Sequence, residues 1–237
     1  MTTGVFRYID PATITHSEEP FIKPWAKVDT DSTSFERTER KRSVADIREA
    51  AANGTEFGVD VSGFAVYSYP SKVKPGAFFA SDDTEVRSEY YAEVEQLLRE
   101  KLGPRVERVV IFDHTIRKHD PSSPRQPVQQ VHVDQTPRAA ETRVRRHVSA
   151  GEADDLLKGE TYSIAPNEKH KFWYMKDMTP DEAMFIKCFD SASQGQPGGQ
   201  DGIAALTPHT AFIDPKTPSD AKGRQSIEVR CLVFYKQ

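Results

Sequence analysis

The chain has 237 residues, of which 37% are hydrophobic and 29% are charged, and its formal net charge is −4. The length and composition predict one globular domain over residues 1–237, with enough apolar residues for a sizeable core. The lack of a basic excess argues against nucleic acid as a partner, and no apolar run is long enough to span a membrane. The N-terminus lacks a signal-peptide pattern, so we expect a cytoplasmic protein.

The first third of the chain combines a polar start with two helical patterns. Residues 1 to about 40 are polar and interrupted by prolines, which predicts an extended N-terminal arm with little regular structure. A short helix is expected in RSVADIREAAANG, where Gly54 ends the apolar spacing. The segment FGVDVSGFAVYSYP predicts a strand with a kink at Gly63. The clearest helical pattern is DDTEVRSEYYAEVEQLLREKLG, which Gly103 ends.

The middle of the chain predicts two strands and a helix. The strands are RVERVVIFDHTIRKH and the segment around His132, and the proline-rich loop DPSSPRQP separates them. The helix is AAETRVRRHVSAGEADDLLKG, with a basic first half that includes Arg143. A solvated helix face is the simplest interpretation of those charges. His114 and His119 have polar, loop-like flanks, and we expect both at the surface.

Short strands dominate the remainder of the chain. They are expected in ETYSI, KFWYM, EAMFIKCFD, TPHTAFI and RQSIEVRCLVFY, with a flexible loop in SASQGQPGGQDG. Cys188 and Cys231 lie in these apolar runs, so we expect buried free thiols. Phe172, Trp173 and Tyr174 either pack as core aromatics or line a pocket. Early helices and a strand-rich second half predict a mainly β fold with flanking helices (α+β), a sandwich or jelly roll.

The segment QPVQQVHVDQT raises the question of a metal site. His132 and Asp134 are two residues apart, and on a strand such residues point to the same face. His209, at the head of an apolar strand in TPHTAFID, is the candidate third ligand. Two histidines and one carboxylate form the facial triad of non-haem iron oxygenases, which leaves positions open for cosubstrate and oxygen. A His-x-Asp pair alone is a weak motif, because in most proteins it marks only two surface residues.

The segment GRQSIEVR strengthens the prediction of a functional site. Arg224, Ser226, Glu228 and Arg230 alternate along one strand face. A forked guanidinium with a hydroxyl beside it suits a carboxylate, such as the distal carboxylate of 2-oxoglutarate. The alternative is an ordinary exposed strand that carries arginines. Taken with the metal pattern, the functional interpretation is favoured.

The chain resembles a known family of Fe(II)/2-oxoglutarate oxygenases, which includes gibberellin desaturase-like proteins and the hydroxylase component of cephamycin methoxylation. Matching segments are spread over nearly the whole chain in the family's order, and the most specific are PVQQVHVDQTP, FWYMKDMTPDEAMFIKCFDS, PHTAF and RQSIEVRCLVF. The resemblance implies that the iron ligands are His132, Asp134 and His209. It implies that Arg224 anchors the 2-oxoglutarate carboxylate with Ser226 beside it, and Arg230 matches the family's second arginine.

The resemblance also implies a reaction and its cofactors. The expected activity is hydroxylation, desaturation or cyclisation of a small-molecule secondary metabolite, with Fe(II), 2-oxoglutarate and O2, and with ascorbate as reductant. Two alternatives stay open. The first is a non-catalytic family member that serves as a structural partner of an active oxygenase. The second is a cupin-like metal enzyme that needs no 2-oxoglutarate.

One departure from the family lies between Gly159 and Glu160. Relatives carry a longer stretch there, with an Asn-x-Trp-Arg-Pro segment, whereas here LLKG runs straight into ETYSI. The implied double-stranded β-helix (jelly roll) is therefore expected to be shortened at this junction. Missing strands expose sheet edges with unpaired backbone groups, which invite pairing with another chain. We therefore expect a homodimer whose two-fold interface covers the opened edge.

Overall fold

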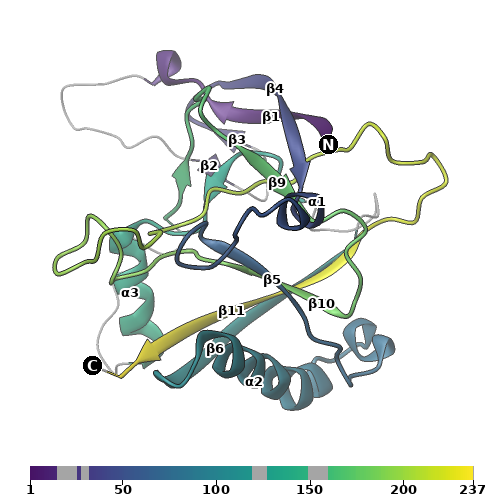
Figure 1. Ribbon diagram of the computed structural model, residues 1–237, viewed down its shortest axis with the longest axis vertical. Helices are drawn as coiled ribbons and strands as arrows, with labels where there is room; N and C mark the ends of the chain where they lie inside the picture. The colour runs from purple at the N-terminus through teal and green to yellow at the C-terminus, as the bar shows by residue number, and fades with distance from the viewer. Residues whose placement is uncertain (15–25, 28–31, 119–126, 149–159, 237) are drawn as a thin grey trace.

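The computed structural model describes residues 1–14, 26–27, 32–118, 127–148 and 160–236 (Figure 1). Its strands are β1 (Thr2–Ile9), β2 (Ala26–Lys27), β3 (Ser32–Thr33), β4 (Arg37–Asp46), β5 (Phe64–Ser68), β6 (Val106–Lys118), β7 (His132–Val133), β8 (Tyr162–Ser163), β9 (Phe172–Tyr174), β10 (Glu182–Ile186) and β11 (Gln225–Tyr235). Its helices are α1 (Ile47–Ala52), α2 (Tyr91–Leu102) and α3 (Pro137–Val148), with short turns η1 (Pro11–Thr13), η2 (Pro75–Phe79) and η3 (Val86–Tyr90). Strands with a few helices confirm the predicted mainly β class.

The N-terminal segment forms part of the largest sheet. This sheet has the strand order β1–β4–β9. β1 and β4 are antiparallel, with Thr2 opposite Val44 and Ile9 opposite Arg37, and β9 runs parallel to β4. The expectation of an arm with little regular structure is therefore wrong for residues 2–9. Residues 15–25 and 28–31 of the expected arm lie outside the described residues.

Burial of aromatic side chains explains this correction. Phe6 and Tyr8 are two residues apart and point to the same face of β1, where they are 1% and 0% exposed. They form a core cluster with Val44 and Val131. The Phe6 ring stacks on Phe172 with 3.9 Å between ring centroids. Each fully buried side chain of this size stabilises the fold by roughly 1.5–3 kcal/mol, and the prolines that suggested an arm begin only after the strand.

Two antiparallel strand pairs complete the framework below this sheet. β5 pairs with β10, and β6 pairs with β11 along most of its length. Helix α2 packs against β6, and Figure 1 shows it running along the outer side of the β6–β11 pair. The predicted strands over β6 and β11 are confirmed. The predicted helix before Gly103 is present as η3 followed by α2, and Gly103 ends it with a φ of 90°.

Several predicted elements are shorter than expected. The helix around residues 42–54 begins only at α1, because β4 extends to Asp46, whose side chain caps the helix by accepting from the Arg48 N–H. The strand over residues 57–70 is reduced to β5, which follows the predicted kink at Gly63, where φ is 79°. The helix over residues 139–159 is present up to Val148, and the rest lies outside the described residues, as does most of the loop 120–127.

The segment TPHTAFI forms no regular strand. Its backbone instead makes an isolated bridge between His209 and His132 and a hydrogen bond from the Ala211 N–H to the Val128 carbonyl. Across the described ranges, no helix has the length and apolar character needed to cross a membrane.

Candidate metal centre

The backbone brings His132 and His209 directly opposite each other. The His132 N–H donates to the His209 carbonyl at 3.1 Å, and the His209 N–H donates to the His132 carbonyl at 2.9 Å. Residues that exchange both bonds in an antiparallel bridge project their side chains from the same face. The two imidazole rings accordingly lie side by side, with 4.5 Å between centroids. Two segments 77 positions apart in the chain (209 minus 132) thus share one site.

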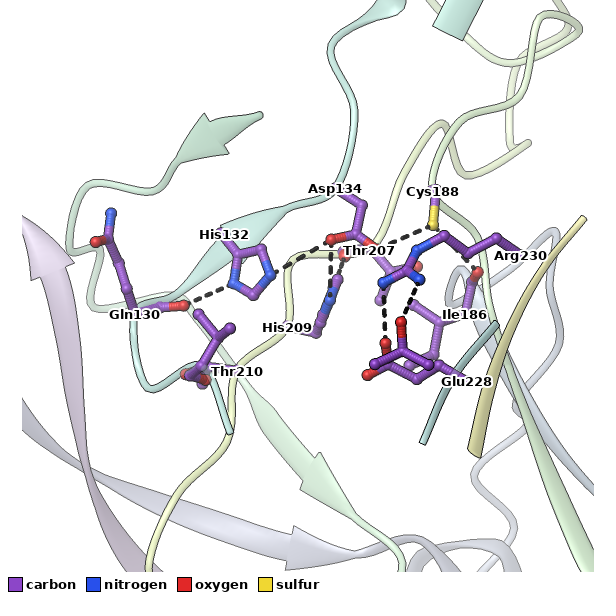
Figure 2. A network of polar contacts seen from close by, with 12 residues as sticks. Gln130, His132, Asp134, Ile186, Cys188, Thr207, His209, Thr210, Glu228 and Arg230 are labelled. Atoms are coloured by element: carbon purple, nitrogen blue, oxygen red, sulfur yellow. Dashed lines mark hydrogen bonds and ion pairs between the residues drawn. The ribbon is translucent and has the colours of Figure 1, made fainter. Parts of the chain in front are cut away.

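Asp134 completes the cluster on the same face. Its Oδ1 lies 3.4 Å from His132 Nε2 and 3.8 Å from His209 Nε2. One ligand atom from each residue lies within 4.8 Å of the other two, the spacing of groups that can hold one metal ion. Figure 2 shows both rings and the carboxylate directed toward one another. The structure therefore brings together the three residues that the sequence analysis named as ligands.

Hydrogen bonds fix the orientation of both rings. His132 Nδ1 lies 2.7 Å from the Gln130 carbonyl, and His209 Nδ1 lies 3.0 Å from the Thr207 carbonyl. A carbonyl only accepts, so each Nδ1 carries a proton, and in the neutral form of each ring Nε2 is the nitrogen whose lone pair can bind a metal. Metal-binding histidines are usually held by such a bond. In both cases the partner is the carbonyl two residues before the histidine.

The charges at the cluster favour a cation. Burial alone would raise the pKa of Asp134, but the hydrogen bond from His132 and the charges of His209, His132 and Arg230 hold that pKa well below its usual range. Burial, with the charge of His132, lowers the pKa of His209. Burial acts to lower the pKa of His132, but its bonds to Asp134 and the Gln130 carbonyl raise it overall. Asp134 is thus held ionised, His209 favours its neutral form, and Asp134 stabilises the protonated form of His132.

The cluster is attached to the core sheet. The Val131 N–H donates to the Arg7 carbonyl of β1, and the Ile164 N–H donates to the Val131 carbonyl. The Gln130 side chain accepts from Arg37 at 2.8 Å and donates to Ser163 at 2.7 Å. The strand that carries His132 is therefore held on both sides before any ligand arrives.

A close contact between Gly63 and Thr207 determines where the loop that carries His209 lies. Thr207 Oγ1 donates to the Gly63 carbonyl at 2.6 Å, and a Cβ at position 63 would lie only 2.2 Å from that Oγ1. The Lys187 N–H donates to the same carbonyl, and the Thr207 N–H donates to Lys187. The glycine thus permits a junction between β5, the end of β10 and the loop that carries His209.

The residues predicted for the cosubstrate lie along β11, in two different environments. Arg224 is exposed just before the strand and makes no hydrogen bond or ion pair with the described part of the chain. Ser226 is half-buried near the start of the strand. Arg230 donates to Asp113 at 3.1 Å, to Thr115 at 3.0 Å and to Glu228 at 3.1 Å. Figure 2 shows Arg230 on the Asp134 side of the cluster.

Cys188 is a neighbour of the cluster whose role the sequence did not reveal. Its Sγ lies 3.7 Å from Asp134 Oδ2, as a weak hydrogen-bond donor. Burial, followed by the charge of Asp134, raises the pKa of this thiol to about 12, so it stays protonated. The thiol is free, as predicted, and the residue is partly buried. Its contact with Asp134, 54 residues away, leaves no local pattern in the sequence.

Other predicted surface and pocket residues are placed differently. Arg143 is half-buried and covers the ring of Phe112 at 5.3 Å, so its assignment to a solvated face is wrong. His114 has a side chain only 9% exposed and lies 2.8 Å from the Tyr91 hydroxyl, so the surface expectation is wrong for it too. His119 lies outside the described residues. Phe172 packs in the core cluster, which supports the core interpretation of that residue.

Comparison with protein families finds one family that matches most of the chain. The family described as "Oxidoreductase/YMDC permease-like domain" matches residues 6–161 and 157–234. The chain belongs to this family. The two matches overlap at residues 157–161, which include the Gly159–Glu160 junction where the sequence analysis expects a shortening.

Curated relatives in this oxidoreductase family come from fungi. The chain is 27% identical over 261 residues to "Hydroxylase/desaturase efuI" of Hormonema carpetanum, covering 80% of this chain and 82% of the relative. It is 29% identical over 203 residues to "Fe(II)/2-oxoglutarate-dependent dioxygenase nvfI" of Aspergillus novofumigatus, covering 65% and 69%. The match to "Hydroxylase/desaturase asaB" of Aspergillus flavus is 49% identical, but it spans only 27% of this chain and 26% of the relative. These relatives confirm the resemblance predicted from the sequence.

A solved structure shares the fold. It is "iron and alpha-ketoglutarate-dependent endoperoxidase NvfI with different conformation", with a TM-score of 0.74 and 21% identity over 99% of this chain and 98% of that chain. At this identity the likeness concerns the fold alone.

Proposed function

We propose that this chain is an Fe(II)/2-oxoglutarate-dependent oxygenase that hydroxylates, desaturates or cyclises a small-molecule secondary metabolite. The observation that carries the proposal is the convergence of His132, Asp134 and His209, with both Nε2 atoms and one carboxylate oxygen directed to one point. The names of the relatives support the same class of reaction.

The donor set fits Fe(II). Two neutral imidazole nitrogens and one carboxylate form a three-ligand site that leaves other positions of the metal open. We infer that His132, Asp134 and His209 hold the iron, and that the Gln130 and Thr207 carbonyls keep the two rings in the ligating orientation. When bound, the iron supplies the activation of oxygen that oxidation of an unreactive carbon requires. The protein supplies ligand geometry and a site in which the substrate is oriented.

We propose that the start of β11 anchors 2-oxoglutarate. The resemblance assigns the carboxylate contact to Arg224, with Ser226 beside it. The exposed guanidinium of Arg224 supports this assignment, because none of its donors is bonded to a residue in the described ranges. Arg230 is already bonded to Asp113, Thr115 and Glu228, which favours a supporting role for it in the wall of the site. Both arginines line the cleft that contains the metal ligands.

We further infer a single jelly-roll domain that is shortened at Gly159–Glu160. The resemblance implies further wall strands at this junction, which this chain lacks. A homodimer in the cytosol, with its interface over the opened edge, remains our proposal for the assembly. Light scattering tests it, since a monomer at high concentration that still turns over 2-oxoglutarate would contradict the dimer.

Turnover of the cosubstrate tests the function. The purified protein is incubated with Fe(II), ascorbate, 2-oxoglutarate and a panel of candidate metabolites, and succinate is measured. We expect succinate that depends on both iron and 2-oxoglutarate and that one metabolite stimulates. Iron binding without any succinate would favour a non-catalytic partner protein, and metabolite oxidation that ignores 2-oxoglutarate would favour a cupin-like enzyme.

A further inference from the structure

Arg143 differs from its neighbour Arg145 on helix α3. Arg145 is exposed and forms an ion pair with Glu141, one helical turn earlier. Arg143 is half-buried. Residues two apart on a helix face different sides, so α3 presents Arg145 to solvent and Arg143 to the body of the protein.

The inward side of α3 faces the metal centre. The guanidinium carbon of Arg143 lies 5.3 Å from the centre of the Phe112 ring of β6. The charge of Arg143 also interacts with the carboxylate of Asp134, one of the three proposed metal ligands. A ligand at the metal centre therefore lies near a positive charge that rests on an aromatic ring.

Arg143 has no hydrogen-bonding partner in the described ranges of the chain. Arg230, the other arginine near Asp134, has three. A partly buried guanidinium without hydrogen-bonding partners is unfavourable, because it loses water that no other acceptor replaces. Burial, followed by the positive charge of Arg230, lowers the pKa of Arg143, and the opposing interactions with Cys188 and Asp134 do not make up for this. An anion bound against Arg143 would remove this penalty.

A carboxylate is the anion that suits this arrangement. The guanidinium edge matches a carboxylate with two parallel hydrogen bonds, and the Phe112 ring offers an apolar surface beside it. We propose that Arg143 binds a carboxylate of the organic substrate, so that the substrate of this chain is an organic acid. This inference rests on the proposed function, because that substrate is the molecule that the metal centre oxidises.

Calorimetric titration with a charged and an uncharged probe tests the inference. The protein is saturated with Fe(II) and 2-oxoglutarate without oxygen, and phenylacetate is compared with phenylacetamide. We expect the wild type to bind phenylacetate about tenfold more tightly, the effect of one charge-assisted contact. Arg143→Met keeps an apolar stem on Phe112 and should abolish the preference. Arg145→Met is the matched control and should keep it, and the Fe(II) affinity of each variant reports whether the site is folded.

A second titration separates the substrate's carboxylate from the cosubstrate's. 2-Oxoglutarate is compared with 2-oxopentanoate, which lacks the distal carboxylate, in the Fe(II)-loaded protein. We expect Arg143→Met to leave both affinities unchanged. A selective loss of 2-oxoglutarate affinity would assign Arg143 to the cosubstrate and overturn the inference. A phenylacetate preference that survives Arg143→Met, or is absent from the wild type, would overturn it as well.

These outcomes are distinct from failure of the proposed function. If the wild type binds neither Fe(II) nor 2-oxoglutarate, the oxygenase proposal fails at its first step, and the inference about Arg143 falls with it.

Discussion

The metal ligands and the arginines of β11 are held in place by different kinds of bonds. Backbone hydrogen bonds set His132 and His209 opposite each other, and backbone carbonyls orient both rings. On β11, Arg230 is placed by other side chains, and Arg224 has no partner in the described part of the chain. Exposed ion pairs typically contribute only about 0–1 kcal/mol, so they fix a position weakly. The difference predicts that the His132–Asp134–His209 cluster is formed before a metal binds, whereas the proposed carboxylate anchor at Arg224 is completed by its ligand.

Removal of a metal ligand gives the largest expected effect. His132→Ala, Asp134→Ala and His209→Ala should each lower Fe(II) affinity by more than about 100-fold, since loss of a mere supporting residue already costs 10–100-fold. The fold should persist, because the strand that carries His132 is anchored to β1 by its backbone. Anaerobic calorimetry measures the affinity. His114→Ala is the control and should bind iron normally, and normal iron content in any of the three variants would remove that residue from the site.

A substitution at Gly63, in the backbone junction with Thr207, should have the next largest effect on folding and on Fe(II) binding. Gly63→Ala places a Cβ 2.2 Å from Thr207 Oγ1 at a φ of 79°, so it should displace the His209 segment and weaken both folding and Fe(II) binding. We expect a loss of more than about 2 kcal/mol in the free energy of unfolding, measured by urea denaturation. Gly54→Ala has a similar φ but no close neighbour, and should cost only about 1 kcal/mol. Equal losses in the two variants would refute the role of the junction.

Substitution of Arg224 should change the affinity of the protein for 2-oxoglutarate. Arg224→Ala should raise the dissociation constant of 2-oxoglutarate about tenfold or more, because a charge-assisted contact is lost, and Fe(II) should stay bound. Arg230→Ala should mainly lower stability, since it removes the contacts with Asp113 and Thr115, while Glu228 keeps its ion pair with Arg117. Calorimetry on the Fe(II)-loaded protein measures both. An unchanged 2-oxoglutarate affinity in Arg224→Ala would move the anchor elsewhere, with Arg230 as the first candidate.

Removal of the Cys188 thiol, which lies beside Asp134, should have a smaller effect on Fe(II) affinity. Cys188→Ala removes a weak hydrogen bond to Asp134 Oδ2, so we expect Fe(II) affinity to fall only a few-fold. Cys188→Ser keeps a donor and should restore most of the loss. Cys231→Ala is the matched control, because this thiol is also buried but contacts only the Val229 carbonyl. The same loss in the Cys231 variant would show a packing effect and not a positioning one.

The smallest expected effect concerns pH and the ion pair of Glu182 with Arg48. The hydrogen bond from Arg48 and the Thr179 N–H lower the pKa of Glu182 from 4.5 to about 2. A pKa below the unfolded value stabilises the folded state at neutral pH, and this contribution is lost as pH falls from about 4.5 to about 2. Glu182→Gln should therefore lower the urea midpoint slightly at pH 7 but hardly at pH 2.5. The exposed Glu56→Gln should show no such difference, and a pH-independent effect of Glu182→Gln would contradict the assignment.

The sequence was sufficient for the local patterns and insufficient for contacts between distant segments. The His-x-Asp spacing predicted that His132 and Asp134 lie together, because a strand fixes which residues share a face, and the family resemblance added His209. The core role of Phe6 and Tyr8 was missed, because β1 depends on pairing with β4, about 35 residues away. Arg143 was read as solvated for the same reason, since its burial depends on Phe112 of another element.

The central claim is tested most directly by anaerobic titration of 2-oxoglutarate into the protein with and without Fe(II). If His132, Asp134 and His209 hold the iron and the iron receives the cosubstrate, 2-oxoglutarate should bind with one-to-one stoichiometry to the iron-loaded protein. Its affinity should fall steeply in the metal-free protein and in His209→Ala. The same 2-oxoglutarate affinity with and without iron, or no stoichiometric Fe(II) binding by the wild type, would contradict the account.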